Sequence, residues 1–571
     1  MLLHGVSASA GIGIGRIVCI REPDLDYSGV QYAGKDAEKA RLQKAIDAFG
    51  EKTRQMAEDM RKRTGEKEAE ILTGQITMLS DPFMLSQMQD RIDSGQCAEA
   101  ALDEVCSTYA DMFAGVDDEM MRQRATDVRD IRARMLALLL GEESVDVASV
   151  PAGSVLLARD LTPSMTVGIH PENVAALLTE VGSKTSHSAI LARALGIPAV
   201  LGIPRAAQLL HDGDTVIVDG GEGVVLASPD ERTMSEYTRR REQAAQQRQQ
   251  LEIYRDRPTL DADGRSYQLY ANIGSLAEAN AACQAGAEGI GLFRTEFLFM
   301  DRTSMPTEAE QYDVYREVAG LMPDKEVIIR TLDVGGDKDI PYLNMEKEEN
   351  PFLGYRAIRY SLDRPDVFRA QLRALLRAGA EHHNIKIMLP LVTSVEEVRS
   401  AKTLLEDCKA QLAKEGLPFD EKIPLGIMVE TPAAALTADL LARESDFFSI
   451  GTNDLTQYTM AVDRGNAKVE NLYTTFHPAV LRSIRSIISA AKEAGIPVGM
   501  CGEAAADECM IPLLLAFGLD EFSVSASRVL ATRKAIAGWR ETAARHAAEE
   551  AMRLSDAAGI EGYLKAVCSR T

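Results

Sequence analysis

The spacing of hydrophobic residues changes along the chain and divides it into stretches with different predicted secondary structure. Residues 1–20 alternate small and apolar side chains, which predicts β-strand. From about residue 35 to residue 140, apolar side chains recur at intervals of three and four positions in long charged stretches, with Pro82 as the one clear break. That stretch predicts a helical bundle of about a hundred residues.

Short apolar segments that are typical of strands return after residue 150. They are SVLLARDL, VAALLTEV, AVLGI, DTVIVDG and GVVLAS. The helical bundle is therefore predicted to be inserted into an α/β domain whose first strand lies within residues 1–20. Gly11, Gly13 and Gly15 do not fit the GxGxxG spacing of a nucleotide-binding loop, and we interpret them as strand and turn.

Residues 231–256 have high helical propensity but are polar on nearly every face, which is typical of a helix between two domains. After Asp263, eight strand-like segments alternate with helical ones, which indicates a closed (β/α)8 barrel. An open, doubly wound sheet is the alternative, but eight evenly spaced units favour closure. The eight segments are YQLYANIG, GIGLFRTEFL, VIIRTLDV, IKIMLPLV, PLGIMVET, FFSIGTNDL, PVGMCGEA and EFSVSA.

Composition narrows the class of protein. The chain has 571 residues, 46% of them hydrophobic, which is enough for several packed domains. Its formal charge of −23 disfavours binding to nucleic acid or to an anionic membrane surface, because both are themselves negatively charged. We expect no membrane span and no secretory signal. The 8 cysteines lack a framework spacing, so we expect reduced thiols in a cytoplasmic protein.

Charged and polar side chains follow the predicted barrel strands where each strand ends, and (β/α)8 barrels place their chemistry at that end. In chain order they are Arg294, Glu296, Arg330, Asp333, Glu430, Asn453, Asp454, Cys501 and Glu503, with Arg356 and Arg464 in the segments between strands. The parallel N–H donors of an arginine match the oxygens of a carboxylate or phosphate. The sequence therefore predicts a site for a small phosphorylated acid.

Two further residue types refine this site. Glu430 and Asp454 offer hard oxygen ligands on adjacent strands, and two carboxylates with substrate oxygens commonly hold Mg²⁺ beside a phosphate. A zinc site is not expected, because no His–His or Cys–His pair has ligand spacing. Cys501 is either a small buried residue or a thiol that keeps its proton and donates it to an enolate, and its place at the strand end favours the second interpretation.

His187 follows the small polar run GSKTS and directly precedes a strongly helical stretch. A helix N-terminus presents unpaired N–H groups and the positive end of the helix dipole, which favours a neutral imidazole and afterwards accommodates a phosphoryl group. We expect Thr185 or Ser186 to cap this helix. His477 is expected to be structural, and His382 and His383 are expected to be solvated.

Several segments together resemble Enzyme I of the bacterial phosphoenolpyruvate:sugar phosphotransferase system. The resemblance runs essentially from end to end and is carried by DLTPS, GSKTSHSAILAR, GLFRTEFL, IIRTLDVGGDK, NPFLGYRAIR, MVETPAA, GTNDLTQYTMAVDRGN and GMCGEAA. It implies that phosphoenolpyruvate phosphorylates a histidine, and that the phosphoryl group then passes to the phosphocarrier protein HPr as the first step of sugar uptake.

The resemblance also implies roles for individual residues. His187 matches the phosphoacceptor, and Cys501 matches the acid that protonates the pyruvate enolate. Glu430 and Asp454 match the ligands of Mg²⁺, the implied cofactor. The expected substrate-binding residues are Arg294, Arg330, Asn453, Asp454, Arg464 and, from its place near the strand ends, Arg356.

Three positions outside that set bear on the fit of the phosphohistidine loop or of HPr. Thr166 is expected to assist His187 by hydrogen bonding if the DLTPSMT stretch folds close to it. Lys184 and Gln75 are variations that affect loop charge or the fit of HPr, not the type of reaction.

The expected organisation has four parts. A phosphohistidine α/β domain comprises residues 1–20 and 145–230, and a helical HPr-binding domain comprises residues 21–144. A helical linker spans residues 231–258, and a phosphoenolpyruvate-binding barrel spans residues 259–571. Because His187 and the barrel lie on opposite sides of the linker, we expect the N-terminal domain to swivel. The resemblance also implies a homodimer formed through the barrel.

Two other interpretations remain open. A pyruvate phosphate dikinase or phosphoenolpyruvate synthase shares the TSH and GTNDLTQY segments, but those enzymes carry an upstream ATP-grasp domain for which this sequence has no room. A non-catalytic regulatory paralogue is expected to have lost site residues, whereas His187, Glu430, Asp454 and Cys501 are all present.

Overall fold

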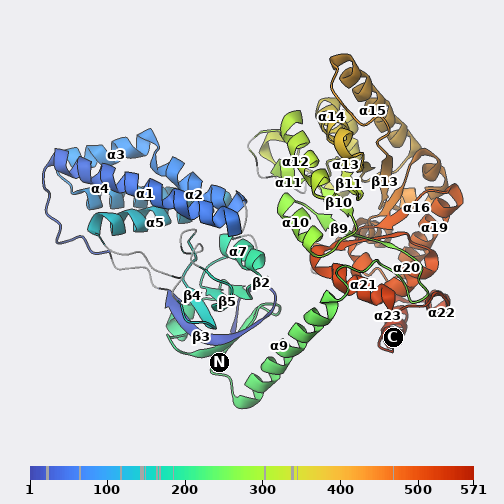
Figure 1. Cartoon of the computed structure of the whole chain (residues 1–571), viewed down its shortest axis with the longest axis horizontal. Coiled ribbons are helices and arrows are strands. Elements are labelled where there is room, and N and C mark those ends of the chain that lie inside the picture. The colour runs from blue at the N-terminus through green and yellow to red at the C-terminus, as the bar shows by residue number, and fades with distance from the viewer. Residues whose placement is uncertain are drawn as a thin grey trace. The chain divides into compact units, whose positions relative to one another are not determined.

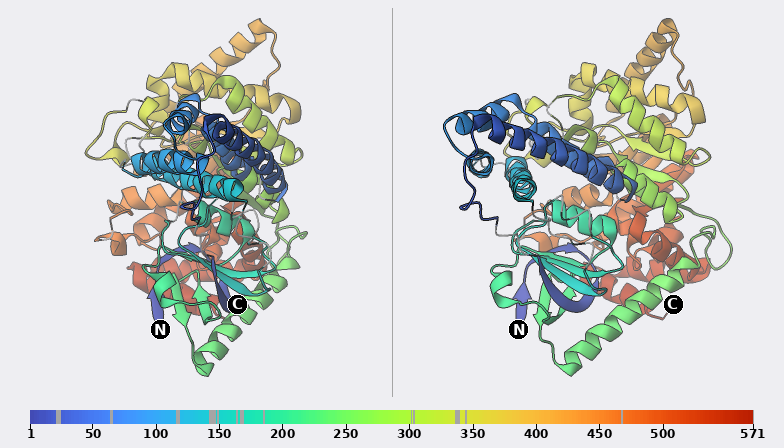
Figure 2. Two further views of the ribbon diagram at one scale, coloured as in Figure 1. Left: turned by 90° about the vertical axis from the view of Figure 1, so that its left-hand side faces the viewer. Right: turned by 60° about the vertical axis from the view of Figure 1, so that its left-hand side comes forward.

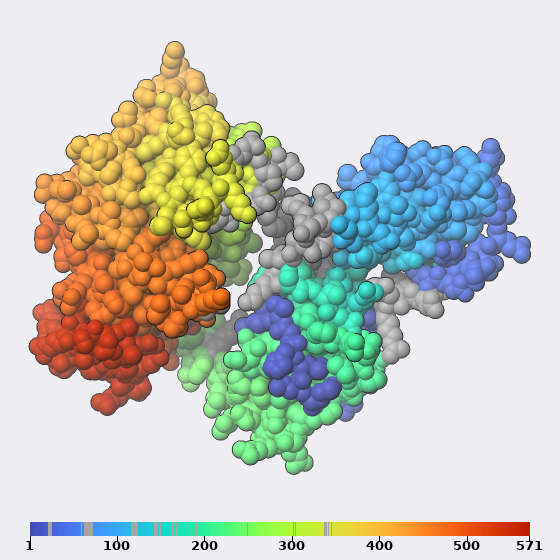
Figure 3. All heavy atoms as spheres, turned by 180° about the vertical axis from the view of Figure 1, so that it is seen from behind, coloured from blue at the N-terminus to red at the C-terminus, as the bar shows by residue number. Residues whose placement is uncertain are grey.

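A computed structural model gives the fold of two compact units, Met1–Gln247 and Arg248–Thr571. It describes residues 1–20, 25–63, 66–115, 119–141, 147, 150–162, 165, 169–183, 186–300, 302, 304–335, 340–343, 345–466 and 468–570. The remaining residues are drawn in grey in the space-filling view of Figure 3. The elements are labelled in Figure 1, and the two units are considered separately.

The first unit contains the predicted helical bundle. Its helices are α1 (Lys35–Arg63), α2 (Glu66–Leu79), α3 (Pro82–Asp93), α4 (Ala98–Ala114) and α5 (Glu119–Leu140), and Figure 2 shows them as long rods packed together. Pro82 is the first residue of α3, where its missing N–H costs nothing, and the Asp81 carboxylate accepts from the backbone N–H groups of Phe83 and Met84. Met88, Ile92, Leu102 and Ile131 pack in the bundle core.

The second part of this unit is an eight-stranded sheet in the order β1-β8-β7-β3-β4-β5-β6-β2. Its strands are β1 (Leu2–His4), β2 (Val6–Ser9), β3 (Ile12–Ile20), β4 (Ser154–Ala158), β5 (Val174–Thr179), β6 (Ala199–Leu201), β7 (Thr215–Asp219) and β8 (Val224–Ala227). Helices α7 (His187–Leu195) and α8 (Ala206–Leu209) lie between strands in the chain. β3 pairs in parallel with β4, so the helical bundle is inserted between two neighbouring strands.

The first strand-like segment is more divided than its pattern predicts, because residues 1–20 form three strands. Gly11 makes the turn into β3 with a φ of +126°, which few other residues adopt. Gly13 lies within β3, where a Cβ atom would come within 2.3 Å of the carbonyl oxygen of Ala175. The interpretation of these glycines as strand and turn is confirmed.

Helix α9 (Glu231–Glu252) matches the predicted polar helix, and the boundary between the two units falls within it. It is largely exposed along its length. In its first half, the Arg240 side chain lies 3.5 Å from the Asp219 carboxylate at the end of β7 and stacks on Tyr237.

The second unit is a closed barrel of eight parallel strands, as predicted. They are β9 (Gln268–Ile273), β10 (Ile290–Arg294), β11 (Val327–Arg330), β12 (Ile385–Leu389), β13 (Leu425–Val429), β14 (Phe448–Ile450), β15 (Val498–Met500) and β16 (Glu521–Ser525). β16 pairs with β9 and closes the barrel, for example at Phe522 and Leu269. Each predicted segment contains one of these strands, and the open-sheet alternative is excluded.

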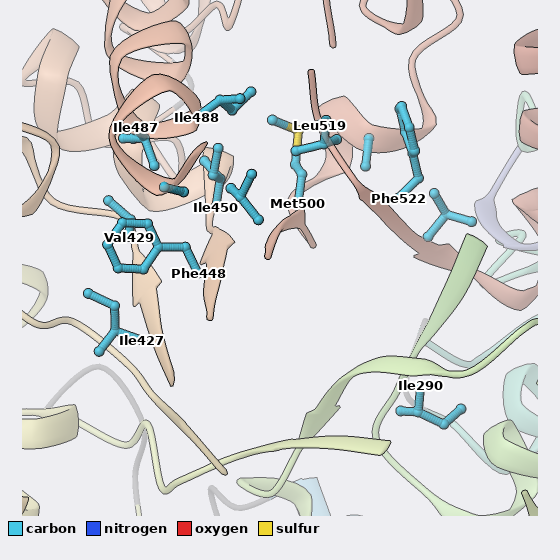
Figure 4. Packing of buried hydrophobic residues seen from close by; sticks show 14 of the residues in the cluster. Ile290, Ile427, Val429, Phe448, Ile450, Ile487, Ile488, Met500, Leu519 and Phe522 are labelled. Atoms are coloured by element: carbon cyan, nitrogen blue, oxygen red, sulfur yellow. The ribbon is translucent and has the colours of Figure 1, made fainter. Parts of the chain in front are cut away.

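Helices surround the barrel and complete its core. They are α10 (Leu276–Gln284), α11 (Phe297–Met300), α12 (Glu308–Leu321), α13 (Ala357–Asp363), α14 (Pro365–His382), α15 (Val395–Glu415), α16 (Pro432–Leu436), α17 (Ala438–Leu441), α18 (Thr452–Met460), α19 (Pro478–Ala494), α20 (Ile511–Phe517), α21 (Val529–Ala537), α22 (Glu541–Arg553) and α23 (Ala557–Cys568). Short 3₁₀ turns lie between them at 341–343, 351–353, 442–444, 470–472, 503–506 and 526–528. Figure 4 shows Ile487 and Ile488 of α19 beside Phe448 and Ile450 of the barrel wall. Among the described helices, none is long and apolar enough to span a bilayer.

Candidate functional site

A cleft of about 1520 Å³ opens at the C-terminal end of the barrel strands. Its walls are the strand ends and the loops that follow them, which is where (β/α)8 barrels carry their sites. The sequence-predicted residues that line it are Arg294, Arg330, Arg356, Glu430, Asn453, Asp454, Arg464 and Cys501. The structure thus brings together every predicted site residue of the barrel.

Arg330, the last residue of β11, lies between two carboxylates. Its Nη2 donates to Glu296 Oε1, and its Nη1 lies 3.1 Å from Asp333 Oδ2. All three side chains are buried, since at most 11% of any of them is exposed. Burial lowers the pKa of the Arg330 guanidinium, but the charges of Glu296 and Asp333 raise it by more, so the pKa lies above its usual value. Arg330 is therefore a fixed positive charge in the cleft.

The ion pairs continue from Asp333 across the cleft. Arg356 donates to Asp333 Oδ1 from Nε at 3.1 Å and from Nη2 at 2.7 Å, and its Nη2 lies 3.7 Å from Asp454 Oδ2. The Nη1 of Arg464 lies 3.2 Å from Asp454 Oδ1. The result is an alternating chain of charges, in the order Glu296, Arg330, Asp333, Arg356, Asp454 and Arg464. We name these six side chains the ion-pair chain.

Glu430 follows β13 and is 3% exposed. Its Oε1 accepts a 2.6 Å hydrogen bond from the backbone N–H of Leu391, which has a left-handed φ of 54°. That backbone is disfavoured for leucine, and such strain is concentrated at functional sites. Burial, then the charges of Asp454 and Asp333, raise the pKa of Glu430 to about 8. A cation between Glu430 and Asp454 would relieve this repulsion.

Two glycines leave space for the Glu430 carboxylate and for the strand ends around it. A Cβ atom on Gly451, the residue that precedes α18, would come within 2.7 Å of Glu430 Oε2. A Cβ atom on Gly502 would come within 1.9 Å of Thr452 Oγ1. The ends of β14 and β15 can therefore approach each other and Glu430 only because these positions lack side chains.

Asn453 and Cys501 line the cleft where β14 and β15 end. The Asn453 amide and Glu503 form two hydrogen bonds, with Nδ2 donating to Glu503 Oε1 at 3.3 Å and the Glu503 N–H donating to Oδ1 at 3.1 Å. Cys501 is 6% exposed and packs against Met428 and Leu292 in the barrel interior while also lining the cleft. Burial raises the pKa of its thiol to about 12, so it holds its proton at neutral pH.

Arg294, at the end of β10, has an unused donor, as Arg330 does at its own Nε. The Arg294 guanidinium stacks on the Phe297 ring at 5.3 Å, and its buried Nε has no hydrogen-bond partner within the described part of the chain. A buried N–H without a partner is unfavourable unless a ligand supplies the acceptor. Arg294 is therefore arranged to receive an anion.

The residues of the cleft fit a magnesium ion. Among the described residues, no group of three or more His, Cys, Asp and Glu side chains is arranged to hold a metal alone. Glu430 and Asp454 are both buried carboxylates, and Mg²⁺ is commonly bound by one or two carboxylates together with oxygens of the substrate. These two residues would hold the ion.

His187 lies in the other unit, as the first residue of α7. Ser186 occupies the N-cap position, but its hydroxyl donates to the Ser183 carbonyl at 2.9 Å and makes no capping bond. The expected side-chain cap from Ser186 is therefore wrong, and the first N–H groups of α7 are not satisfied by it. Thr185, Lys184 and Thr166 lie outside the described residues.

The other histidines largely follow expectation. The Nδ1 of His477 accepts from the Ala479 N–H at 3.2 Å and caps α19, which confirms a structural role. His383 is 65% exposed, as predicted, and its ring lies 3.2 Å from Asp420. His382 was expected to be solvated, but its side chain is only 25% exposed because it forms the last turn of α14 rather than a loop.

Several cleft residues did not follow from the sequence pattern. Asn272, the last residue but one of β9, donates to the carbonyl groups of Cys501 and Ser523 at 3.0 and 3.2 Å. Its position at a strand end was the available signal. Tyr473 donates to the Asn453 carbonyl at 3.1 Å from a loop without periodicity, and no sequence signal indicates it.

Fixed cationic side chains, a proton-bearing thiol and paired carboxylates at a barrel mouth define an enzyme that acts on a small phosphorylated acid. Comparison with known proteins agrees. Models of the PEP-utilising enzymes match the chain in three places: the PEP-binding domain at residues 248–540, the N-terminal domain at 4–124 and the mobile domain at 150–223.

Curated relatives narrow the family. Proteins named phosphoenolpyruvate-protein phosphotransferase are 42% identical in Staphylococcus carnosus (96% of both chains), 44% identical in Priestia megaterium (94% of this chain and 93% of the relative) and 42% identical in Bacillus subtilis (99% of both). The chain belongs to the PEP-utilising enzymes and, within them, to the phosphoenolpyruvate-protein phosphotransferases.

Proposed function

We propose that this enzyme transfers the phosphoryl group of phosphoenolpyruvate to its own His187 and then to the histidine phosphocarrier protein HPr, the first step of sugar uptake by the phosphotransferase system. The observation that carries the proposal is the convergence of Arg294, Arg330, Arg356 and Arg464 on one cleft with Glu430, Asp454 and Cys501. Phosphoenolpyruvate carries both a phosphate and a carboxylate, and arginines suit both groups.

The arginines bind and orient the substrate. Arg294 offers its unpartnered Nε, and Arg330 and Arg464 each contribute guanidinium donors beyond those bound to carboxylates. Asn453 adds an amide held in place by Glu503. Because the ion-pair chain holds the guanidinium groups in place before the substrate binds, these side chains do not have to reorganise as negative charge develops on the substrate. Bound Mg²⁺, held by Glu430 and Asp454, would supply neutralisation of phosphate charge.

Cys501 acts on the other product. When the P–O bond breaks, the phosphorus bonds to a nitrogen of His187 and the electron pair of the bond leaves with enolpyruvate. The Cys501 thiol then gives its proton to the methylene carbon of the enolate, and solvent restores that proton. A thiol whose pKa is raised by burial is a competent acid here because it is still protonated at neutral pH.

The N-terminal unit carries the acceptor. A neutral imidazole at the N-terminus of α7 is a nucleophile, and the phosphoryl group that it receives is stabilised by the same helix end. We propose residues 1–20 and 145–230 as the phosphohistidine domain, residues 21–144 as the HPr-binding domain and residues 231–258 as the linker. His187 and the arginines belong to different units, so loading requires a swivel that brings His187 to the cleft.

Two further parts of the proposal concern assembly and location. We propose a homodimer through the barrel, supported by large apolar side chains that the described surface exposes, with Leu436 84% and Leu353 65% exposed. Sedimentation at several concentrations tests it. We also propose a cytoplasmic protein with reduced cysteines, in keeping with its eight free thiols.

The transfer to HPr tests the proposal directly. The enzyme is incubated with labelled phosphoenolpyruvate and Mg²⁺, separated from excess substrate, and mixed with HPr. We expect label to leave the enzyme and appear on an HPr histidine as an acid-labile phosphate. His187→Gln is the matched negative variant, and His477→Gln is the control, because that histidine caps a helix. Label that stays on the enzyme would contradict the role of HPr.

A further inference from the structure

Two of the eight cysteines face each other next to the cleft. Cys509 follows the 3₁₀ turn Glu503–Ala506, and Cys568 is the last residue of α23. The Cys568 Sγ donates to the carbonyl oxygen of Glu508 at 3.6 Å, so it lies against the peptide group that joins Glu508 to Cys509. Each of the two thiols also affects the pKa of the other, as expected of side chains that lie close together.

Both cysteines are partly accessible, whereas Cys106, Cys408 and Cys501 are buried. Each packs on the edge of the barrel core, so neither is held by an exposed, freely moving segment. A disulfide joins side chains whose Cβ atoms are about 3.8 Å apart, and the Cys568 sulfur, 3.6 Å from the carbonyl oxygen that precedes Cys509, is near enough for small adjustments to bring the two sulfurs together.

The pair bridges two parts of the cleft wall. The segment from Cys501 to Met510 supplies cleft-lining residues on both sides of Cys509, with Glu503 and Glu508 before it and Met510 after it. Helix α23 supplies Glu561 to the same wall. A change in the distance between Cys509 and Cys568 therefore has to be absorbed by α23 or by the segment that also holds Cys501 and the Asn453 partner Glu503.

We propose that Cys509 and Cys568 are a thiol–disulfide modification site through which a low-molecular-weight disulfide slows the phosphotransferase reaction. The effect on the reaction rests on the proposed function, whereas the existence of the disulfide does not.

The chemistry is thiol–disulfide exchange. The thiolate of Cys509 attacks one sulfur of the small disulfide, and one equivalent of small thiol leaves. The thiolate of Cys568 then attacks the Cys509 sulfur of the mixed disulfide, and the second equivalent leaves. The two cysteines are oxidised by two electrons, the small disulfide is reduced to two thiols, and the two cysteine protons end on those thiols.

The surroundings determine which sulfur reacts first. Burial, and then the charge of Asp507, raise the pKa of Cys509, while the neighbouring Cys568 and the charge of Lys565 offset part of that rise. Burial and the neighbouring Cys509 raise the pKa of Cys568 to about 12. Cys509 is thus the first nucleophile and Cys568 the resolving thiol, and because both hold their protons at neutral pH the exchange is slow.

Closing the bond alters the site. Sulfur atoms in contact must approach to about 2.05 Å when they are bonded, a shortening of roughly 1 to 2 Å that the loop and α23 have to absorb. Misplacement of catalytic groups by about 1 Å can cost on the order of a hundredfold in rate. We expect at least a tenfold loss of pyruvate formation from phosphoenolpyruvate, fully reversed by dithiothreitol.

The test treats the full-length enzyme with oxidised glutathione and follows three quantities: free thiols, the cross-linked peptide and the rate of pyruvate formation. Cys509→Ser and Cys568→Ser are the matched variants, and both retain Cys501. The expected result is loss of two free thiols per chain, a peptide that joins Cys509 to Cys568, and slowing of the wild type but of neither variant.

Each other outcome is decisive. If no Cys509–Cys568 peptide forms while other thiols become oxidised, the modification site is refuted whatever the enzyme does with phosphoenolpyruvate. If the peptide forms and the rate is unchanged, its influence on the reaction is refuted. If Cys509→Ser slows as much as the wild type, oxidation of Cys501 is the cause and the proposal fails. A wild type without any activity before oxidation would count against the proposed function alone.

Discussion

The guanidinium of Arg356 donates two hydrogen bonds to a single oxygen of Asp333, at 3.1 and 2.7 Å. The other oxygen of Asp333 faces Arg330 at 3.1 Å, so one carboxylate 4% exposed holds two buried arginines. The negative charge of Asp333 repels an anionic substrate, so Asp333 does not itself bind the substrate. It holds Arg330 and Arg356 in position for the substrate.

Asp333→Ala should therefore destabilise the barrel. Removing one partner of a buried ion pair leaves a charge without compensation and typically costs about 3 to 5 kcal/mol of folding free energy. Denaturant unfolding of the barrel transition measures the loss. The control is Asp366→Ala, whose partner Arg364 is 41% exposed and whose loss should cost under about 1 kcal/mol. Equal, small losses of unfolding free energy for both variants would show that the ion-pair chain contributes little to the stability of the barrel.

Arg294→Lys should impair substrate use more than stability. Lysine keeps the positive charge but cannot present the planar pair of donors, and it loses the stacking on Phe297. We expect kcat/KM for phosphoenolpyruvate to fall by roughly a hundredfold, about 2.7 kcal/mol of transition-state stabilisation. Arg528→Lys is the control, because Arg528 lines the same cleft but is exposed. If the two substitutions have equal effects, Arg294 has no special role.

Cys501→Ala should separate the two halves of the reaction. Pyruvate formation should slow by at least a hundredfold because the enolate loses its acid, whereas phosphoryl exchange between phosphorylated HPr and the enzyme should be spared. Burial raises the thiol pKa to about 12, so the wild-type rate should not fall through loss of this proton between pH 7 and pH 10. Rapid-quench assays measure both half-reactions, and an equal loss of both would contradict the role of Cys501 in the proton transfer.

Glu521 provides a stability prediction at the opposite end of the barrel. It begins β16, its Oε1 is buried and has no partner among the described atoms, and Cβ atoms on Gly291 or Gly499 would strike its carboxyl oxygens. Burial, then Glu326, raises its pKa from 4.5 to about 8. Between these two pH values the folded state binds more protons than the unfolded state, so stability falls as pH rises.

Glu521→Gln removes this titration. Relative to the wild type, the variant should gain about 3 kcal/mol in unfolding free energy between pH 5 and pH 8. Denaturant unfolding at both pH values measures it, and Glu493→Gln, at an exposed position of α19, should show no such gain. A pH-independent difference for Glu521→Gln would mean that its carboxyl is ionised in the folded protein.

The barrel could be predicted because its signal is local. Each strand is a short apolar run, and the residues that follow it must lie at one end of a closed parallel sheet. Arg294, Arg330, Glu430, Asp454 and Cys501 followed from that rule. The helical insertion followed from a change of hydrophobic period from two to between three and four.

Pairings between distant residues could not be predicted in the same way. Which arginine faces which carboxylate depends on loop paths such as the one that carries Arg356 back to Asp333. The contact of Cys509 with Cys568 depends on where α23 docks, and neither cysteine stands in a recognisable motif. The predicted side-chain cap of α7 by Ser186 was wrong for a local reason, because the Ser186 hydroxyl donates backwards to the Ser183 carbonyl.

The central claim is that the cleft passes the phosphoryl group of phosphoenolpyruvate to His187. A single-turnover experiment with enzyme in excess, Mg²⁺ and labelled phosphoenolpyruvate measures pyruvate and acid-labile phosphate on the protein at the same time. The account predicts that both appear together, in equal amounts, and that His187→Gln forms neither. Pyruvate formed without phosphorylated protein, or label retained by His187→Gln, would contradict it.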